Sequence, residues 1–119
     1  MKAWFASLLM LLIPLGTPDA GERFACNMGA LTSAERARHE ELSRSLFAAV
    51  RVKKELRNGY AFRLPSGMLA TAAGWVALER RCCPFFTFDL ELVKHDGPLW
   101  LRITGAPGVK AFIRSELQI

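Results

Sequence analysis

Residues 66–92 read SGMLATAAGWVALERRCCPFFTFDLEL and decide the fold. The first part carries apolar residues at helical spacing, and Ser66 after a proline is the expected N-cap. We therefore predict a helix over residues 67–82, which Pro84 ends because a residue before proline is pushed out of helical geometry. From Phe86 onward apolar and polar residues alternate, the pattern of a strand with one buried face. The chain thus passes from helix to strand directly after two adjacent cysteines.

Patterns on both sides of this stretch predict the remaining elements. A Thr-x-x-Glu capping box at Thr32 and Glu35 begins a helix over residues 33–49. The other predicted elements are a hairpin over residues 52–64, a second hairpin over residues 86–104 and a short helix that begins at residue 109. This order, α-ββα-ββα, predicts a two-layer α+β fold with one antiparallel four-stranded sheet from two hairpins and helices mainly on one face.

The register of the first hairpin follows from the burial of one face. A two-residue Asn58-Gly59 turn would place charged residues on the same face as the aromatic ones. A three-residue loop from Arg57 to Gly59, with Gly59 left-handed, gathers the apolar residues on one face, so we predict this register. Its facing pairs are Leu56 with Tyr60, Lys53 with Arg63 and Val52 with Leu64.

Length and composition indicate one folded domain after an export signal. The chain has 119 residues, 51% of them apolar, and a net charge of +5. Residues 1–20 have the layout of a secretory signal peptide, which leaves residues 21–119 as a single α+β domain. Their apolar run, residues 3–15, is shorter than the roughly 20 residues that span a bilayer, so no permanent membrane span is expected. We predict a periplasmic or secreted protein, or a cytoplasmic one if the gene start is mispredicted.

The adjacent thiols of Cys82 and Cys83 are the strongest functional feature. Glu79 precedes them by three and four residues, so its carboxylate can face either sulfur from one turn away. The helix carboxyl end and this carboxylate are both negative and raise a thiol pKa, although Arg80 and Arg81 oppose this. The balance disfavours an activated nucleophile. It suits a bound soft cation, which supplies positive charge and deprotonates thiols.

We therefore predict a soft metal or metalloid site formed by Cys26, Glu79, Cys82 and Cys83. Three sulfurs would suit Hg(II), As(III) or Cu(I), and Zn(II) if Glu79 or His39 becomes a fourth ligand. One alternative is a non-catalytic structural or interaction domain whose cysteines are core residues, or in which Cys26 forms a disulfide with Cys82 or Cys83. Another is a thiol oxidoreductase.

Several function classes have no support in the sequence. There is no Ser-His-Asp pattern, phosphate-binding glycine loop or paired-carboxylate site, so a hydrolase or nucleotide enzyme is not indicated. The chain is more typical of a binding protein than of an enzyme. Basic residues gather between Arg51 and Arg63, but a solvated face explains them, and an exported protein seldom meets DNA. His95 is expected to be a loop residue.

Several segments resemble a small family of uncharacterised bacterial proteins that share a Cys-Cys-Pro-Phe segment. The matching segments lie within residues 24–119: residues 24–28, 30–39, 58–60, 79 with 82–85, and 101–105. The resemblance implies no activity. It implies only that Cys26, Glu79, Cys82 and Cys83 fall inside the matching segments.

Overall fold

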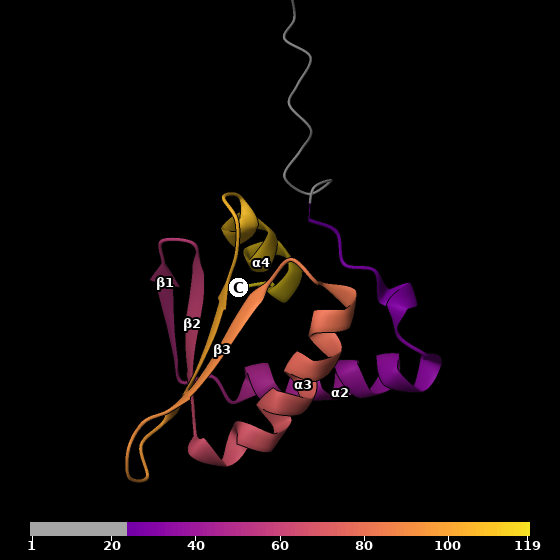
Figure 1. The fold of residues 1–119 in the computed structure, drawn as a ribbon. Helices are drawn as coiled ribbons and strands as arrows, with labels where there is room; N and C mark the ends of the chain where they lie inside the picture. The colour runs from indigo at the N-terminus through magenta and orange to yellow at the C-terminus, as the bar shows by residue number, and fades with distance from the viewer. Residues whose placement is uncertain (1–23) are drawn as a thin grey trace, which may run out of the picture.

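The computed structural model describes residues 24–119 (Figure 1), so the predicted signal peptide, residues 1–20, lies outside the described residues. The chain forms, in order, η1 (Met28–Ala30), α2 (Ser33–Ala48), β1 (Val52–Leu56), β2 (Gly59–Leu64), η2 (Ser66–Met68), α3 (Leu69–Cys82), β3 (Thr87–Leu92), β4 (Leu99–Thr104) and α4 (Val109–Leu117). The helices and strands follow the predicted α-ββα-ββα order. The α+β fold class is confirmed.

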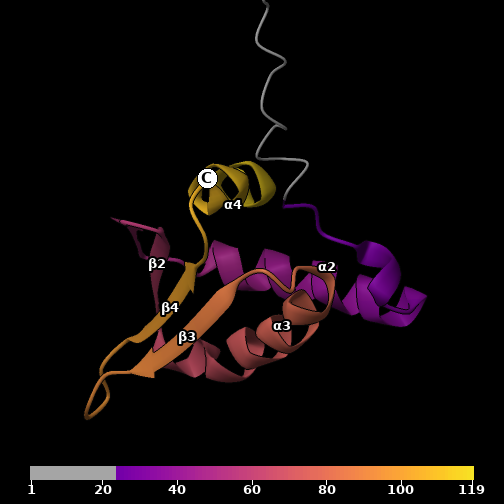
Figure 2. The ribbon, with the colours of Figure 1, turned by 45° about the horizontal axis from the view of Figure 1, so that its top comes forward.

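The strands form one antiparallel sheet in the order β1-β2-β4-β3. Figure 2 shows α2 and α3 on one side of this sheet, with α4 near the end where β4 finishes. Leu46, Trp75 and Ile113 come from the three helices, and each is at most 1% exposed. They belong to the same core as Phe62 and Leu101 of the central strands. The core is therefore a single layer between the sheet and the helices.

The start of α2 agrees with the capping box in the sequence. The backbone N–H of Glu35 donates to Thr32 Oγ1 at 3.1 Å, and the backbone N–H of Thr32 donates to Glu35 Oε1 at 2.9 Å. These bonds satisfy two backbone donors at the helix terminus that have no partner within the helix. Leu42 and Leu46 form the buried stripe of the helix.

The start of α3 differs from the prediction, whereas its end agrees. A 3-10 turn takes Ser66–Met68, the α-helix begins at Leu69, and its N-cap is Met68, which makes no side-chain cap. The tighter turn after the extended Pro65 leaves Ser66 too early in the chain to cap the helix. The α-helix ends at Cys82, as expected from Pro84 two residues later.

The predicted register of the first hairpin is wrong by one residue. Leu56 faces Gly59 and Glu55 faces Tyr60, so the loop is the two residues Arg57 and Asn58. Positive φ among the described glycines occurs at Gly108, not at Gly59. Gly59 instead begins β2, and a Cβ there would lie 1.9 Å from the carbonyl oxygen of Ile103 in β4.

The apolar pattern misplaced this register because β1 is an edge strand with little burial of its own. Its charged residues on the helix side have partners: Glu55 pairs with Lys110 of α4, and the Lys53 ammonium lies 5.8 Å from the ring centroid of Tyr60. Lys53 faces Phe62, and Val52 faces Arg63. The predicted opposition of Lys53 and Arg63 is therefore also wrong, and the two cations lie on opposite faces.

The sheet face away from the helices is polar. Arg102 forms ion pairs with Glu91 at 3.1 Å and with Asp89 at 3.8 Å across β3 and β4. The Lys54 ammonium lies 5.3 Å from the ring centroid of Trp100 on the same face. Among the described helices, none combines the length and apolar character needed to cross a membrane.

Candidate metal centre

Cys26 and Cys83 form a disulfide, with their Cα atoms 4.6 Å apart, and Cys82 is a buried free thiol. Of the two partners that the sequence left open for Cys26, the structure assigns Cys83. Cys83 is the C-cap of α3, and its backbone is no longer helical, with φ −125° and ψ 71°. The backbone N–H of Asn27 donates to the carbonyl of Cys82 at 2.7 Å. This bond brings the neighbouring Cys26 to the end of the helix.

Non-covalent contacts also hold the segment that carries Cys26. Arg81 donates to the carbonyl of Ala30 at 3.0 Å and forms an ion pair with Glu35. Arg36 donates to the carbonyl of Leu31 at 2.8 Å. The Leu31 side chain is buried in one cluster with Cys82 and Cys83. Several contacts other than the disulfide therefore keep this segment at the end of α3.

Glu79 is a buried acidic residue at the interface of two helices. It is 3% exposed, and its Oε2 contacts Nε2 of His39 from α2. The imidazole of His39 stacks on Trp75, with ring centroids 6.2 Å apart, and Trp75 Nε1 donates to Ser43 Oγ at 2.8 Å. A buried carboxylate is costly unless it is paired, and His39 supplies that partner.

Cys82 lies against the same carboxylate. Its Sγ is 3.9 Å from Glu79 Oε2 and 3.8 Å from Cys83 Sγ. Burial, and then the negative charge of Glu79, raise the pKa of the Cys82 thiol to about 11. The thiol is therefore neutral near pH 7, which agrees with the sequence argument against an activated nucleophile.

Two groups of ligand atoms have the spacing of a metal site. Within each group, the potential ligand atoms lie within 4.8 Å of one another. The first group is Cys26, Glu79 and Cys83, and the second is His39, Glu79 and Cys82. Glu79 belongs to both groups, whereas Cys82 falls in a different group from Cys26 and Cys83.

His39 was predicted only as an optional fourth ligand. A signal for its position exists in the sequence, because residue 39 precedes Leu42 by three and Leu46 by seven and so lies on the buried stripe of α2. Its partner Glu79 is 40 residues away, and no local pattern joins the two. Glu116 was not predicted as a site residue.

An open cleft of about 290 Å³ between α2, α3 and the end of α4 reaches Glu79, the residue that the two ligand groups share. His39, Glu79, Trp75 and Glu116 are among its lining residues. Partial burial, and then the charge of Glu79, raise the pKa of the Glu116 carboxyl. The charge of Glu79 on α3 therefore acts on the Glu116 carboxyl of α4 across the cleft.

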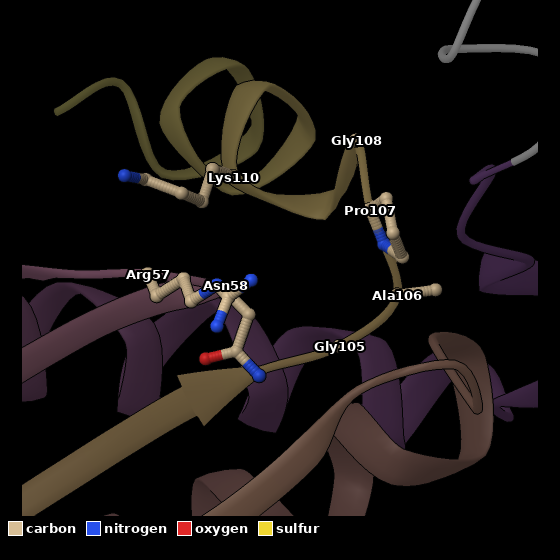
Figure 3. A pocket seen from close by; sticks show the side chains of 7 residues that line it. All are labelled: Arg57, Asn58, Gly105, Ala106, Pro107, Gly108 and Lys110. Atoms are coloured by element: carbon tan, nitrogen blue, oxygen red, sulfur yellow. The ribbon is translucent and has the colours of Figure 1, made fainter.

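A second cleft, of about 520 Å³, lies between the β1–β2 loop and the start of α4 (Figure 3). Arg57 and Lys110 line it together with the Gly105–Gly108 turn. Lys110 is already paired with Glu55. His95, which the sequence placed in a loop, lies in the β3–β4 turn with φ 60°.

A comparison of the chain with protein-family models, curated proteins and solved structures finds no match.

Proposed function

We propose that the protein binds a thiophilic metal or metalloid ion through Cys26, Cys82 and Cys83, with Glu79 as an additional ligand, when the disulfide is reduced. The observation that carries the proposal is the clustering of the sulfurs: Cys82 Sγ lies 3.8 Å from Cys83 Sγ, which is bonded to Cys26. Three thiolates gathered around one ion favour soft ions such as Hg(II), As(III) and Cu(I).

The contacts of the N-terminal segment support a site that persists after reduction. The Asn27–Cys82 backbone hydrogen bond and the Arg81–Ala30 hydrogen bond do not depend on the disulfide. The Cys26 thiol would therefore stay beside Cys83 instead of diffusing away. Such preorganisation lowers the entropic cost of gathering three ligands around an ion.

The raised pKa of Cys82 is compatible with this function. A neutral buried thiol next to a carboxylate is a poor nucleophile, but a soft cation displaces its proton and compensates the charge of the thiolate. The same property weighs against the thiol oxidoreductase alternative.

The disulfide supports export as part of the proposal, because disulfides persist mainly in oxidising compartments. Loading of a soft ion there would require a dithiol reductant. The reductant gives up two electrons and two protons and becomes a disulfide, and the Cys26 and Cys83 sulfurs become thiols.

Native mass spectrometry of the reduced protein with arsenite and with phenylarsine oxide tests the proposal. Arsenite takes three thiolates and phenylarsine oxide takes two. We expect Cys82→Ser to weaken arsenite binding by at least about tenfold. Substitution of a residue that only hydrogen-bonds to a metal ligand already lowers metal affinity by about that factor, and Cys82 is a proposed ligand itself. Phenylarsine oxide binding should survive, because Cys26 and Cys83 remain.

The chain has three cysteines, so the matched control is the same protein with its disulfide intact. It should bind neither arsenical. Failure of the reduced wild type to retain arsenite, or equal retention by fully alkylated protein, would refute the proposal.

A second candidate function is that of a structural or interaction domain in which the disulfide only stabilises the fold. The bond joins residues separated by 57 positions, for which the loop-entropy model gives about 4 kcal/mol of stabilisation. Full burial of Cys82 and Cys83 agrees with this role. In that case the reduced protein would not retain arsenite.

A further inference from the structure

The ligand group His39, Glu79 and Cys82 does not include either half of the disulfide. We infer that the disulfide-bonded protein binds a borderline divalent cation of the Zn²⁺ class at His39 Nε2, Glu79 Oε2 and Cys82 Sγ. The ion enters through the cleft between α2, α3 and α4. This inference goes beyond the soft-ion proposal, because it needs neither reduction nor the sulfurs of Cys26 and Cys83.

The donor set has the chemistry of a zinc site. One imidazole nitrogen, one carboxylate oxygen and one thiolate are all common Zn²⁺ ligands, with bonds of about 2.0–2.3 Å. A tetrahedral ion with such bonds separates its sulfur and oxygen ligands by about 3.5 Å. The Cys82 Sγ to Glu79 Oε2 distance is 3.9 Å. A small side-chain adjustment therefore suffices on this side, while the His39–Glu79 contact opens to admit the ion.

The helices hold the three ligands in position. Glu79 and Cys82 are three residues apart on α3 and project from neighbouring turns of one rigid element. His39 is on α2, which packs directly on α3, and its ring is stacked on Trp75. The hydrogen bond from Trp75 to Ser43 of α2 fixes the two helices next to the site. A site on packed helices keeps its geometry better than a site on loops.

Charge and access also favour a cation. His39 and Glu79 line the cleft, and Cys82 lies behind Glu79, fully buried. Glu116 lines the same cleft and offers a further carboxylate at its rim. An ion bound between these groups would reach its ligands from solvent through the cleft and would be shielded by the protein on the sulfur side.

Glu79 and Cys82 belong to both this ligand set and the soft-ion set, so the two ions would compete for the protein. The His39, Glu79 and Cys82 set is complete in both redox states, whereas the soft-ion set is complete only after the disulfide is reduced. The oxidised protein offers one sulfur, one nitrogen and one carboxylate, whereas the reduced protein offers three sulfurs and a carboxylate. Softer ions prefer the second set.

Titration of the disulfide-bonded protein with Co²⁺ as a spectroscopic substitute for Zn²⁺ tests the inference. We expect one bound ion, a thiolate-to-cobalt charge-transfer band, and displacement of Co²⁺ by Zn²⁺. His39→Gln and Cys82→Ser should each weaken Co²⁺ binding by at least about tenfold, and Cys82→Ser should also abolish the band.

The matched control for the loss of one imidazole is His95→Asn in the β3–β4 turn, where Asn tolerates the positive φ. This variant should bind Co²⁺ as the wild type does. The inference is overturned if the disulfide-bonded wild type shows no charge-transfer band, or if His95→Asn weakens binding as much as His39→Gln.

The double variant Cys26→Ser/Cys83→Ser separates this inference from the soft-ion proposal. It lacks two of the three sulfurs needed for arsenite but keeps His39, Glu79 and Cys82. We expect it to bind Co²⁺ with the charge-transfer band and not to bind arsenite. Loss of Co²⁺ binding in a folded double variant would overturn the inference. Arsenite binding by the reduced wild type would still support the soft-ion proposal, because it does not depend on that result.

Discussion

At the scale of single residues, one carboxylate organises the candidate site. Glu79 is buried, contacts His39 from another helix, and lies 3.9 Å from the Cys82 sulfur. A carboxylate of this kind is retained in a protein interior when it is paired, and both proposed ligand sets use it. Its position three residues before Cys82 was visible in the sequence, but the partner from α2 was not.

Gly59 provides a prediction at the same scale. A Cβ at residue 59 would lie 1.9 Å from the carbonyl oxygen of Ile103, an atom of the β4 backbone, so Gly59→Ala must push two central strands apart. We expect it to lower the free energy of unfolding by more than about 2 kcal/mol, as strained core substitutions do. Urea denaturation measures the change.

Gly67→Ala is the matched control, because no heavy atom lies within 4 Å of the Cβ that it adds. It should change stability by less than about 0.5 kcal/mol, as most surface substitutions do. Equal stabilities for the two variants would contradict the close approach of β2 and β4.

At the scale of elements, an ion pair between Glu35 at the start of α2 and Arg81 at the end of α3 clamps the two helices beside the cysteine cluster. The hydrogen bond from Arg81, followed by that from the Thr32 backbone, lowers the pKa of the Glu35 carboxyl from 4.5 to about 2. Because the ionised form is favoured in the folded state, the carboxylate stabilises the fold.

The sign of this pKa shift predicts an acid-dependent loss of stability. The contribution of Glu35 is fully present above pH 4.5 and disappears as the pH falls from about 4.5 to about 2. Glu35→Gln should therefore flatten the profile of unfolding free energy against pH over that range. Glu40→Gln, which removes an exposed acidic residue from the same helix, should not. Parallel profiles of unfolding free energy against pH for wild type and Glu35→Gln would contradict a stabilising Glu35–Arg81 ion pair.

At the scale of the whole molecule, the protein has one main core and a small cluster beside it. The main core lies between the helices and the sheet and contains none of the cysteines among its fully buried residues. The small cluster contains Leu31, Cys82 and Cys83, with Cys26 packed against it. The disulfide fastens the N-terminal segment to this cluster, so the fold does not depend on it alone.

This division predicts that the disulfide is important for stability but dispensable for folding. Cys26→Ser/Cys83→Ser should lower the free energy of unfolding by about 4 kcal/mol, the chain-entropy value for a loop closed across 57 positions, and leave the far-ultraviolet circular dichroism unchanged. Cys82→Ala, which removes one buried sulfur without opening a loop, should cost about 1 kcal/mol. A double variant as stable as the wild type would contradict this role.

The sequence by itself determined the features that depend on neighbours a few residues apart. The capping box set the start of α2, Pro84 set the end of α3, and alternation located both hairpins. The same local spacing placed Glu79 one turn before Cys82 and Cys83. These features follow from backbone geometry and short-range hydrogen bonds, which any chain with these residues would share.

Only the tertiary structure decided the rest, because the contacts involved join distant segments. It selected Cys83 over Cys82 as the partner of Cys26, brought His39 to Glu79 across 40 residues, and set the β1–β2 register through contacts of Glu55 and Lys53 outside the hairpin. Each depends on how helices and strands pack after they form, and the energy of that packing is not encoded in any local pattern.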